Sequence, residues 1–320
     1  MLTLAAIEDA ADIIYRSMRP TPQYAWPLLA EAVGGPIWVK HENHTPTGAF
    51  KVRGGLVMLH ELARRSTRGT GIVSATRGNH GQSLAFAASR HGIACTIVVP
   101  RGNSTEKNAA MRAFGAELVE EGEDFDAAKA HAQALAEERG LFMVPSFHAD
   151  LVRGVATYAM EFLRAVPELD VVYVPIGLGS GICGLISARD VLGLKTKIVG
   201  VVSDKADAYA QSLETGKRTE TASAATFADG MAVRCPDETA LAMIRAGAED
   251  IVRVSDDQVA EAIRLYYRST HNLAEGAGAA SLAALMADGK RGKTPGVILC
   301  GQNIDTAWMR DVLAGHTPSP

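Results

Sequence analysis

The sequence predicts an α/β protein made of two doubly wound domains, each with a parallel sheet. The chain has 320 residues, more than one compact hydrophobic core usually spans, so two domains are expected. Short apolar runs alternate along the chain with stretches of helical periodicity. Because a parallel crossover needs a covering element, this alternation is typical of parallel sheets with helices on both faces.

The expected strands are short, rich in β-branched residues and in several cases followed by Gly or Pro. They span residues 72–74, 95–99, 117–119, 141–144, 171–174, 198–202 and 297–300. Most of these runs are continuously apolar, as a strand covered on both faces can be. The last residues, 315–320, have the composition of a loose tail.

Composition argues against several classes of function. Lys and Arg number 32 against 36 Asp and Glu, so the net charge is -4 and no basic stripe for a phosphate backbone is expected. Glu8, Asp9 and Asp12 interrupt the N-terminal stretch where a secretory signal would be apolar, and no apolar run is long enough to span a bilayer. The four cysteines are too widely spread for a metal site or a disulfide framework. We expect a soluble, cytoplasmic protein with reduced thiols that binds neither nucleic acid nor membranes.

A lysine between apolar neighbours is the first candidate for chemistry. Residues 41–55 read HENHTPTGAFKVRGG, a polar stretch that delivers Phe50, Lys51 and Val52 to the start of an apolar helix. An amine in a partly desolvated pocket has a lowered pKa and becomes a nucleophile toward an aldehyde. Taken alone, the pattern is more often a surface lysine at a helix start. The segments described next favour a catalytic role for Lys51.

A strand, a glycine turn and a helix start come next along the chain. The turn contains Thr76, Arg77, Gly78, Asn79 and His80. Unpaired backbone N–H groups and the helix dipole favour an anion at such a place, and the α-carboxylate of an amino acid is the expected occupant. The side-chain amide of Asn79 could then hydrogen-bond a ring hydroxyl of a second bound group. A simple helix cap is the alternative interpretation.

A second glycine turn links the strand at 171–174 to an apolar helix. It consists of Gly177, Leu178, Gly179, Ser180 and Gly181. Closely spaced glycines let backbone N–H groups approach a phosphate, and the helix dipole stabilises its charge. A nucleotide-binding loop is the competing interpretation, but the turn lacks the Gly-Lys-Ser/Thr ending of a P-loop and does not fit the G-x-G-x-x-G spacing.

A buried-type strand near the C-terminus ends at Cys300. It is followed by a turn that begins Gly301-Gln302-Asn303. An isolated cysteine in this position is by default a core residue. Its place after a strand also allows it to line a site.

These four segments resemble the fold-type II pyridoxal-5'-phosphate (PLP) enzymes, and most of all their threonine/serine dehydratase and serine racemase branch. The resemblance rests on PTGAFKVRG, RGNHGQ, the second glycine turn and LCGQN, in this order. It implies that Lys51 carries PLP as a Schiff base, that Phe50 lies beside the ring and that Asn79 contacts the ring hydroxyl. It also implies that residues 177–181 hold the phosphate and that Cys300 faces the pyridine nitrogen. A neutral thiol there would make the ring a weaker electron sink, which suits elimination.

The same resemblance implies the domain organisation. Residues 1–70 and 148–320 would form a larger PLP-binding domain, and residues 71–147 a smaller inserted domain with the substrate-carboxylate loop. Substrate would bind between the two domains. Its contacts would be Thr76, Arg77, Gly78 and His80. The family also implies a homodimer.

Two departures from the family pattern bear on function. The loop that usually reads Ser-Ser-Gly-Asn-His is TRGNH here. In racemases the second serine is an acid/base group, and the permanently charged Arg77 is a poor proton shuttle, so racemisation is disfavoured. The positions that bind a divalent cation in some relatives correspond to Val202 and Ala208, which lack the oxygen ligands that such ions need. We expect no metal site.

The favoured function is β-elimination, in which threonine or serine is dehydrated and deaminated to a 2-oxo acid and ammonia. Lys51 would remove the α-proton. If Arg77 turns into the cleft, 3-hydroxyaspartate or another hydroxy amino acid is the alternative substrate. Racemisation and β-replacement are further alternatives, but Val52 and His80 differ from the residues usual in β-replacement enzymes. A non-catalytic PLP-binding protein is the remaining alternative, and the intact Lys51 and Asn79 argue against it.

Overall fold

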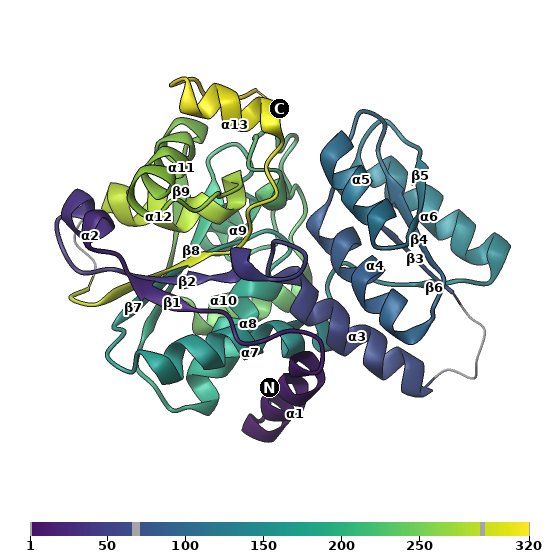
Figure 1. The fold of residues 1–320 in the computed structure, drawn as a ribbon, viewed down its shortest axis with the longest axis horizontal. Coiled ribbons are helices and arrows are strands. Elements are labelled where there is room, and N and C mark those ends of the chain that lie inside the picture. Colours follow the sequence, from purple (N-terminus) through teal and green to yellow (C-terminus); the bar gives the residue numbers. More distant parts are fainter. Residues whose placement is uncertain (1, 66–70, 289–291, 320) are drawn as a thin grey trace.

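The protein has two lobes, each built on its own β-sheet (Figure 1). The structure is a computed structural model and describes residues 2–65, 71–288 and 292–319. Nearly all strand pairings are parallel, and helices lie on both faces of each sheet. The α/β fold class that the sequence predicts is confirmed.

The larger lobe contains, within the described residues, a six-stranded sheet of order β1-β2-β10-β7-β8-β9. Its strands are β1 (Gln23–Ala25), β2 (Trp38–His41), β7 (Val171–Pro175), β8 (Lys197–Ser203), β9 (Asp250–Val254) and β10 (Pro295–Leu299). Only β1, at one edge, runs antiparallel to its neighbour within this part of the chain. An antiparallel edge strand on an otherwise parallel sheet is a common arrangement.

Helices cover both faces of this sheet. Helices α11 and α12 pack on one face, and α7, α8 and α10 form the layer on the other. The helices of the larger lobe are α1 (Leu4–Tyr15), α2 (Pro27–Val33), α3 (Lys51–Arg65), α7 (Ala149–Ala165), α8 (Ser180–Val191), α9 (Ala208–Thr215), α10 (Glu238–Gly247), α11 (Asp256–Thr270), α12 (Gly276–Asp288) and α13 (Thr306–Leu313). Short 3-10 turns occur at Glu42–His44 and Asp229–Met231.

The smaller lobe is a four-stranded parallel sheet of order β5-β4-β3-β6 within the described residues. Its strands are β3 (Ile72–Ala75), β4 (Cys95–Val99), β5 (Glu117–Glu120) and β6 (Phe142–Met143). Helices α4 (Asn79–His91) and α5 (Thr105–Ala113) cover one face, and α6 (Phe125–Arg139) covers the other. The exact limits of the inserted domain, residues 71–147, stay a prediction.

Local sequence explains where many elements begin and end. All residues of β4, β7 and β10 are buried, which fits their largely apolar sequences. The Asp124 side chain accepts a hydrogen bond from the backbone of α6, and Gly140 ends that helix in the left-handed conformation. Ser255 and Gln258 form a capping box at the start of α11.

Helix α3 joins the two lobes, because it packs on α4 of the smaller lobe and α7 of the larger lobe. Its glycine pair makes this contact possible. A Cβ on Gly54 would lie 2.9 Å from the carbonyl oxygen of Leu151, and one on Gly55 would lie 2.2 Å from Ser83 Oγ. Larger residues would therefore push the helices apart. As a result the first turn of α3, which begins with Lys51, is fixed between the lobes.

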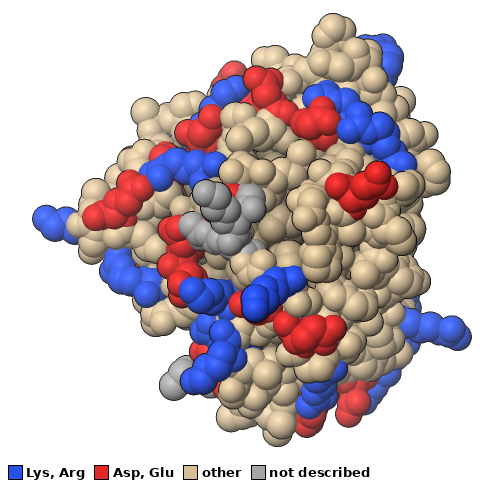
Figure 2. All heavy atoms as spheres, turned by 90° about the vertical axis from the view of Figure 1, so that its left-hand side faces the viewer, with Lys and Arg blue, Asp and Glu red and all other residues tan. Residues whose placement is uncertain are grey.

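The surface mixes both signs of charge. In Figure 2, which shows the side of the larger lobe that bears α2, basic and acidic side chains lie close together with no broad field of one sign. Among the described helices, none combines the length and the apolar character needed to cross a bilayer.

Candidate active site

A cleft of about 720 Å³ lies between the lobes. Its walls contain every site residue that the sequence singles out, although these residues are separated by up to about 250 positions in the chain. They come from four loops, and each loop follows the carboxyl end of a strand: β2, β3, β7 and β10. Ligands bind at this end of the strands in open α/β sheets.

Lys51 lies at the centre of the cleft, at the start of α3. The chain before it is held by a hydrogen bond from Phe50 N to the carbonyl oxygen of Cys300, at 2.9 Å. Lys51 Nζ is 5.0 Å from the centre of the Phe50 ring and donates to Ser180 Oγ at 3.2 Å. Burial of the amine lowers the pKa of Lys51 to about 8, although the nearby Glu275 carboxyl group opposes this shift. A neutral, nucleophilic amine is therefore accessible near physiological pH.

The asparagine turn connects β3 to α4, and Asn79 is the first residue of the helix. The Thr76 hydroxyl accepts the backbone N–H of Gly78 at 3.0 Å and shapes the turn. Asn79 is held by Glu275 and Asn303 of the larger lobe. The first backbone N–H groups of α4 have no partner within the helix, so the turn can bind an anion.

His80 lies in the same turn and is neutral. Burial, reinforced by the positive charge of Lys51, lowers the pKa of His80 to about 3. Its Nε2 atom is buried and has no hydrogen-bond partner among the described residues. A buried ring nitrogen without a partner at the wall of a cleft is a candidate contact for a bound ligand.

The second glycine turn connects β7 to α8. Gly179 has a φ of 103°, a conformation that favours glycine. A Cβ on Gly177 would lie 2.3 Å from the carbonyl oxygen of Gly230. Ser180 begins α8 and is 3% exposed. Apart from Leu178, the turn therefore consists of small residues at a helix N-terminus, next to the Lys51 amine.

Cys300 directly follows β10 and is almost fully buried. Burial raises the pKa of its thiol well above the usual value, so the thiol stays neutral. Its backbone carbonyl holds Phe50, as described above, and the neighbouring Gly301 forms a bridge with Ala49. Cys300 is thus connected to the Lys51 loop rather than being an isolated core residue.

Arg77 stands apart from the other residues of the asparagine turn. It is exposed and lines the cleft. Within the described part of the chain it has neither a hydrogen bond nor an ion pair. The same is true of Lys129 from α6, which also lines the cleft.

Sequence reasoning missed four polar residues that line or support the cleft. They are Lys107, Asp229, Glu275 and Asn303. One signal was available, because Glu275 is a single acidic residue within an apolar, small-residue stretch from 274 to 285. A charge in such a stretch is costly to bury unless it has partners.

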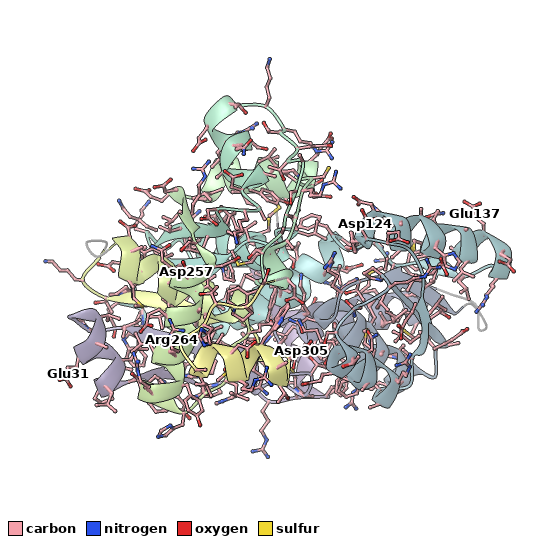
Figure 3. The ribbon with its side chains drawn as sticks, turned by 90° about the horizontal axis from the view of Figure 1, so that it is seen from above. Glu31, Asp124, Glu137, Asp257, Arg264 and Asp305 are labelled. Carbon is pink, nitrogen blue, oxygen red and sulfur yellow. The ribbon has the colours of Figure 1, made fainter. Side chains whose placement is uncertain are left out.

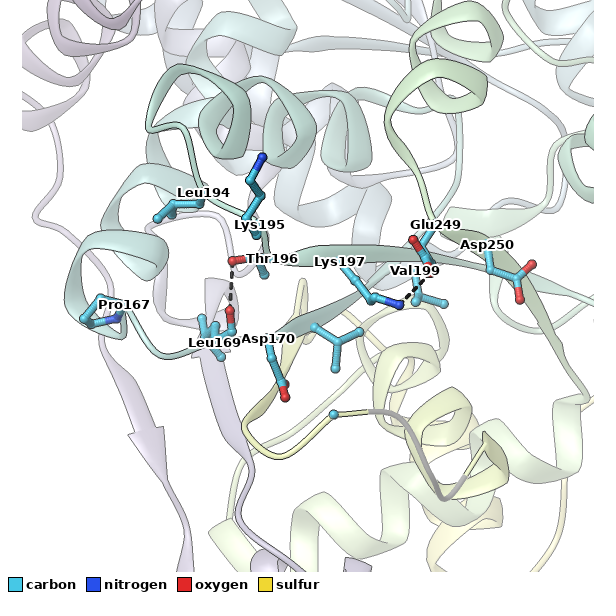
Figure 4. A pocket seen from close by; sticks show the side chains of 12 residues that line it. Pro167, Leu169, Asp170, Leu194, Lys195, Thr196, Lys197, Val199, Glu249 and Asp250 are labelled. Carbon is cyan, nitrogen blue, oxygen red and sulfur yellow. Dashed lines mark hydrogen bonds and ion pairs between the residues drawn. The ribbon is translucent and has the colours of Figure 1, made fainter.

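A second hollow lies at the opposite end of the larger sheet, where β7 and β8 begin (Figure 4). Thr196 donates to the carbonyl oxygen of Leu169 at 2.8 Å, and Lys197 pairs with Glu249 at 2.7 Å. These polar groups are thus engaged in a hydrogen bond and an ion pair with each other. The hollow therefore does not compete with the cleft as a reaction site.

Comparison with known proteins relates this cleft to one enzyme family. The family model described as "Pyridoxal-phosphate dependent enzyme" matches residues 14–301. An L-threonine ammonia-lyase of Geobacter sulfurreducens is 36% identical over 98% of this chain and 78% of its own length. An L-threonine ammonia-lyase of Thermotoga maritima is 32% identical over the same shares. A crystal structure of a pyridoxal 5'-phosphate-dependent aspartate racemase superposes with a TM-score of 0.91 at 28% identity, covering 96% of this chain and 98% of the racemase.

Proposed function

We propose that the chain, which belongs to the family of pyridoxal-phosphate dependent enzymes, dehydrates and deaminates a small β-hydroxy amino acid. Threonine and serine are the proposed substrates, and a 2-oxo acid and ammonia the products. One observation carries the proposal: the Lys51 amine, with a pKa lowered to about 8, lies in a cleft that is also lined by the asparagine turn and the second glycine turn. The ammonia-lyase relatives support the same reaction.

The residues of the cleft fit PLP. The cradle at residues 177–181 would hold the phosphate through backbone N–H groups and the Ser180 hydroxyl, because it combines small residues with a helix N-terminus. Asn79 donates one amide hydrogen to Glu275 and has a second for the ring hydroxyl. The neutral Cys300 thiol would face the ring nitrogen.

When bound, PLP supplies an electron sink for the negative charge that develops at the substrate α-carbon. Lys51 Nζ accepts the α-proton, and its lowered pKa suits a base that works near neutral pH. Ser180 Oγ lies 3.2 Å from Nζ and is within reach to pass this proton on. The α C–H bond and the β C–O bond break, and the proton and the hydroxyl leave as water. The released enamine then reacts with water to give the 2-oxo acid and ammonia.

The asparagine turn would bind the substrate carboxylate. The start of α4 offers backbone N–H groups, and the shape of the turn is fixed by Thr76 and Gly78. The neutral His80 adds a ring nitrogen without a partner in the described structure. Together these groups would orient the α C–H bond toward Lys51. They would not place a second base on the face of the substrate opposite Lys51.

The residue at one position of the asparagine turn favours elimination over racemisation. Racemisation needs a group that returns a proton to the face opposite Lys51. Arg77, at the position where the racemases have a serine, is exposed, and a guanidinium group is a poor general acid or base. We therefore keep racemisation as the less favoured activity.

An acidic hydroxy amino acid is a second candidate substrate. Arg77 and Lys129 both line the cleft and have no ion-pair partner among the described residues. Two such cations in the wall of the cleft would attract a second carboxylate, such as that of 3-hydroxyaspartate.

A substrate panel tests the proposal. Purified protein with PLP would be given L- and D-serine, L- and D-threonine, 3-hydroxyaspartate and phenylserine, and 2-oxo acid and ammonia would be measured. We expect equimolar products from at least one of these compounds and none with Lys51→Ala. Lys197→Ala serves as a matched control, because Lys197 is exposed at the opposite end of the sheet. Product release by Lys51→Ala at the wild-type rate would disprove the assigned role.

We also propose a homodimer that works in the cytoplasm. Exposed apolar side chains support the dimer, since Tyr24 and Leu28, on β1 and α2, are 47% and 60% exposed. The free thiols of the described cysteines fit a reducing compartment. Light scattering after size-exclusion chromatography tests the first point, and fractionation of the source cells tests the second.

A further inference from the structure

The larger lobe holds the side-chain amide of Asn79 from both sides. Asn79 Nδ2 donates to Glu275 Oε1 at 2.6 Å, and Asn79 Oδ1 accepts from Asn303 Nδ2 at 2.8 Å. Asn303 Nδ2 also donates to the carbonyl oxygen of Thr47 at 2.8 Å. The orientation of the amide is therefore set by residues outside the asparagine turn. Glu275 is the charged member of this group.

Lys107 connects Glu275 to the smaller lobe. It comes from α5, and its Nζ atom donates to Asp229 and lies 3.7 Å from Glu275 Oε2. Its aliphatic stem supports the turn, because a Cβ on Gly78 would lie 2.5 Å from Lys107 Cδ. One side chain thus contacts the residue before Asn79 and places a positive charge near the carboxylate that binds Asn79.

Glu275 needs this positive charge. It is 2% exposed, and its Oε2 atom has no hydrogen-bond partner among the described residues. The ionisable groups that act on it are Lys107, Asp229, Lys51 and Cys300. Burial raises the pKa of Glu275 above its usual value, and Lys107 opposes that rise. Without Lys107 the carboxylate would take up a proton more easily.

We propose that Glu275 is a positioning residue for Asn79, and that Lys107 is the group from the smaller lobe that holds Glu275 in place and favours its charged form. The inference rests on the proposed function, because it assumes that Asn79 faces bound PLP. An ionised Glu275 accepts one amide hydrogen of Asn79 through a charge-assisted hydrogen bond and leaves the other for the cofactor. The arrangement is complete only when the two lobes are in contact.

Another contact between the lobes provides a matched control. Glu106 precedes Lys107 on α5, and its Oε1 accepts the backbone N–H of Thr306 at 2.8 Å. The neighbouring Asp305, which accepts the Ser104 hydroxyl, lies where the lobes meet in Figure 3. Glu106 does not line the cleft. Glu106→Gln therefore weakens a contact between the lobes without touching Glu275 or Asn79.

The test uses Glu275→Gln, Lys107→Met, the double variant, Lys107→Arg and Glu106→Gln. The dissociation constant of PLP would be measured by titrating each apoprotein, and the absorbance of bound PLP would be followed from pH 5.5 to 9. Burial raises the pKa of Glu275 to about 7 in the wild type, and removing Lys107 should raise it further. We expect Lys107→Met to weaken PLP binding about tenfold just above pH 7, where Glu275 is ionised in the wild type and protonated in the variant, which is the effect of losing one charge-assisted hydrogen bond. At pH 5.5 the two proteins should bind PLP alike, because Glu275 is protonated in both. In Lys107→Met, the pH at the midpoint of the acid-side change in the absorbance of bound PLP should move to a higher value. Glu275→Gln should abolish that midpoint, and adding Lys107→Met to it should change nothing further.

Four results test the inference. The inference would be overturned if Lys107→Met and Glu275→Gln both kept the wild-type affinity for PLP and the wild-type absorbance midpoint. Glu106→Gln should keep both. If Lys107→Met lowers only the melting temperature of the apoprotein and leaves the midpoint unchanged, Lys107 is structural and the inference is again overturned. Lys107→Arg keeps the positive charge and should restore the midpoint even if Lys107→Met folds poorly. Failure of the wild-type protein to bind PLP on Lys51 would instead contradict the proposed function.

Discussion

Replacing Arg53 by methionine should destabilise the protein far more than the loss of a surface ion pair. The Arg53 guanidinium is fully buried and donates to both oxygens of Glu42, at 2.7 and 2.9 Å, and to both oxygens of Glu161, at 2.6 and 2.9 Å. Lys40 is also fully buried and donates to Glu161 at 2.6 Å. Two cations therefore balance two anions. Arg53→Met leaves two carboxylates facing one ammonium group.

The expected loss follows from the cost of an unpaired buried charge. Removing one partner of a buried ion pair costs about 3–5 kcal/mol. Folded domains are stable by about 5–15 kcal/mol, so the variant should lose a large part of its free energy of unfolding. Urea unfolding of the apoprotein at pH 7, followed by far-UV circular dichroism, measures the change through the midpoint concentration at unchanged slope.

Arg65→Met is the matched control on the same helix. Its side chain is 68% exposed, and its guanidinium lies 3.9 Å from Glu61 and 3.8 Å from Asp150. Exposed pairs of this kind contribute about 0–1 kcal/mol. Equal losses for Arg53→Met and Arg65→Met would refute the claim that the buried charges anchor the start of α3.

The same buried charges predict how stability depends on pH. Burial acts to raise the pKa of Glu161, but Arg53 and Lys40 outweigh burial and hold this pKa below its usual value. A carboxyl group with a depressed pKa stabilises the folded state above its unfolded pKa, and this contribution is lost as pH falls through the folded pKa. The wild-type protein should lose stability below about pH 4.5, the ordinary value for Glu. Arg53→Met should lose this part of its stability at a higher pH.

Four further predictions concern the cleft. Borohydride should fix PLP to Lys51, and a reduced adduct mapped to another lysine would contradict this assignment. The rate of reconstitution of the apoprotein with PLP should rise as pH increases through about 8, because only the neutral Lys51 amine attacks the aldehyde, whereas a flat profile would argue against the lowered pKa. Dialysis against a chelator should leave the rate unchanged, since Val202 and Ala208 offer no oxygen ligand, and several-fold recovery with magnesium or calcium would disagree. If Arg77 binds a second carboxylate, Arg77→Ser should cut kcat/KM for 3-hydroxyaspartate about tenfold and spare serine, and equal effects on both substrates would exclude that role.

The central strands of both sheets could be predicted from sequence, and the edge of the larger sheet could not. Strands such as β7 and β10 are covered on both faces, so their sequences are continuously apolar. In contrast, β9 is an edge strand with partly exposed residues and the mixed sequence DIVRV. Strands β1 and β2 have only three and four residues beside polar segments. A search for apolar runs does not detect such strands.

The loops of the cleft could be predicted because their chemistry is local. A glycine turn before a helix can be identified from a few adjacent residues, as at residues 177–181. The partners of Asn79 could not be predicted in this way. Glu275 and Asn303 lie about 200 positions farther along the chain, and only the completed fold brings them to the asparagine turn. Lys107 carries no motif, and its role depends on the contact between the two lobes.

The four loops meet because of how the larger sheet is ordered. Strands β2, β10 and β7 are neighbours and run parallel, so the Lys51 loop, Cys300 and the second glycine turn leave the sheet at the same edge. The asparagine turn leaves the smaller sheet and reaches this edge because α3 packs against both lobes. The position of Lys51 therefore depends on the first turn of α3, which the buried charges around Arg53 hold to the larger lobe. A lysine with a lowered pKa is useful only if it is also fixed in place, so Arg53→Met should slow the reaction of Lys51 with PLP even at temperatures where the variant remains folded.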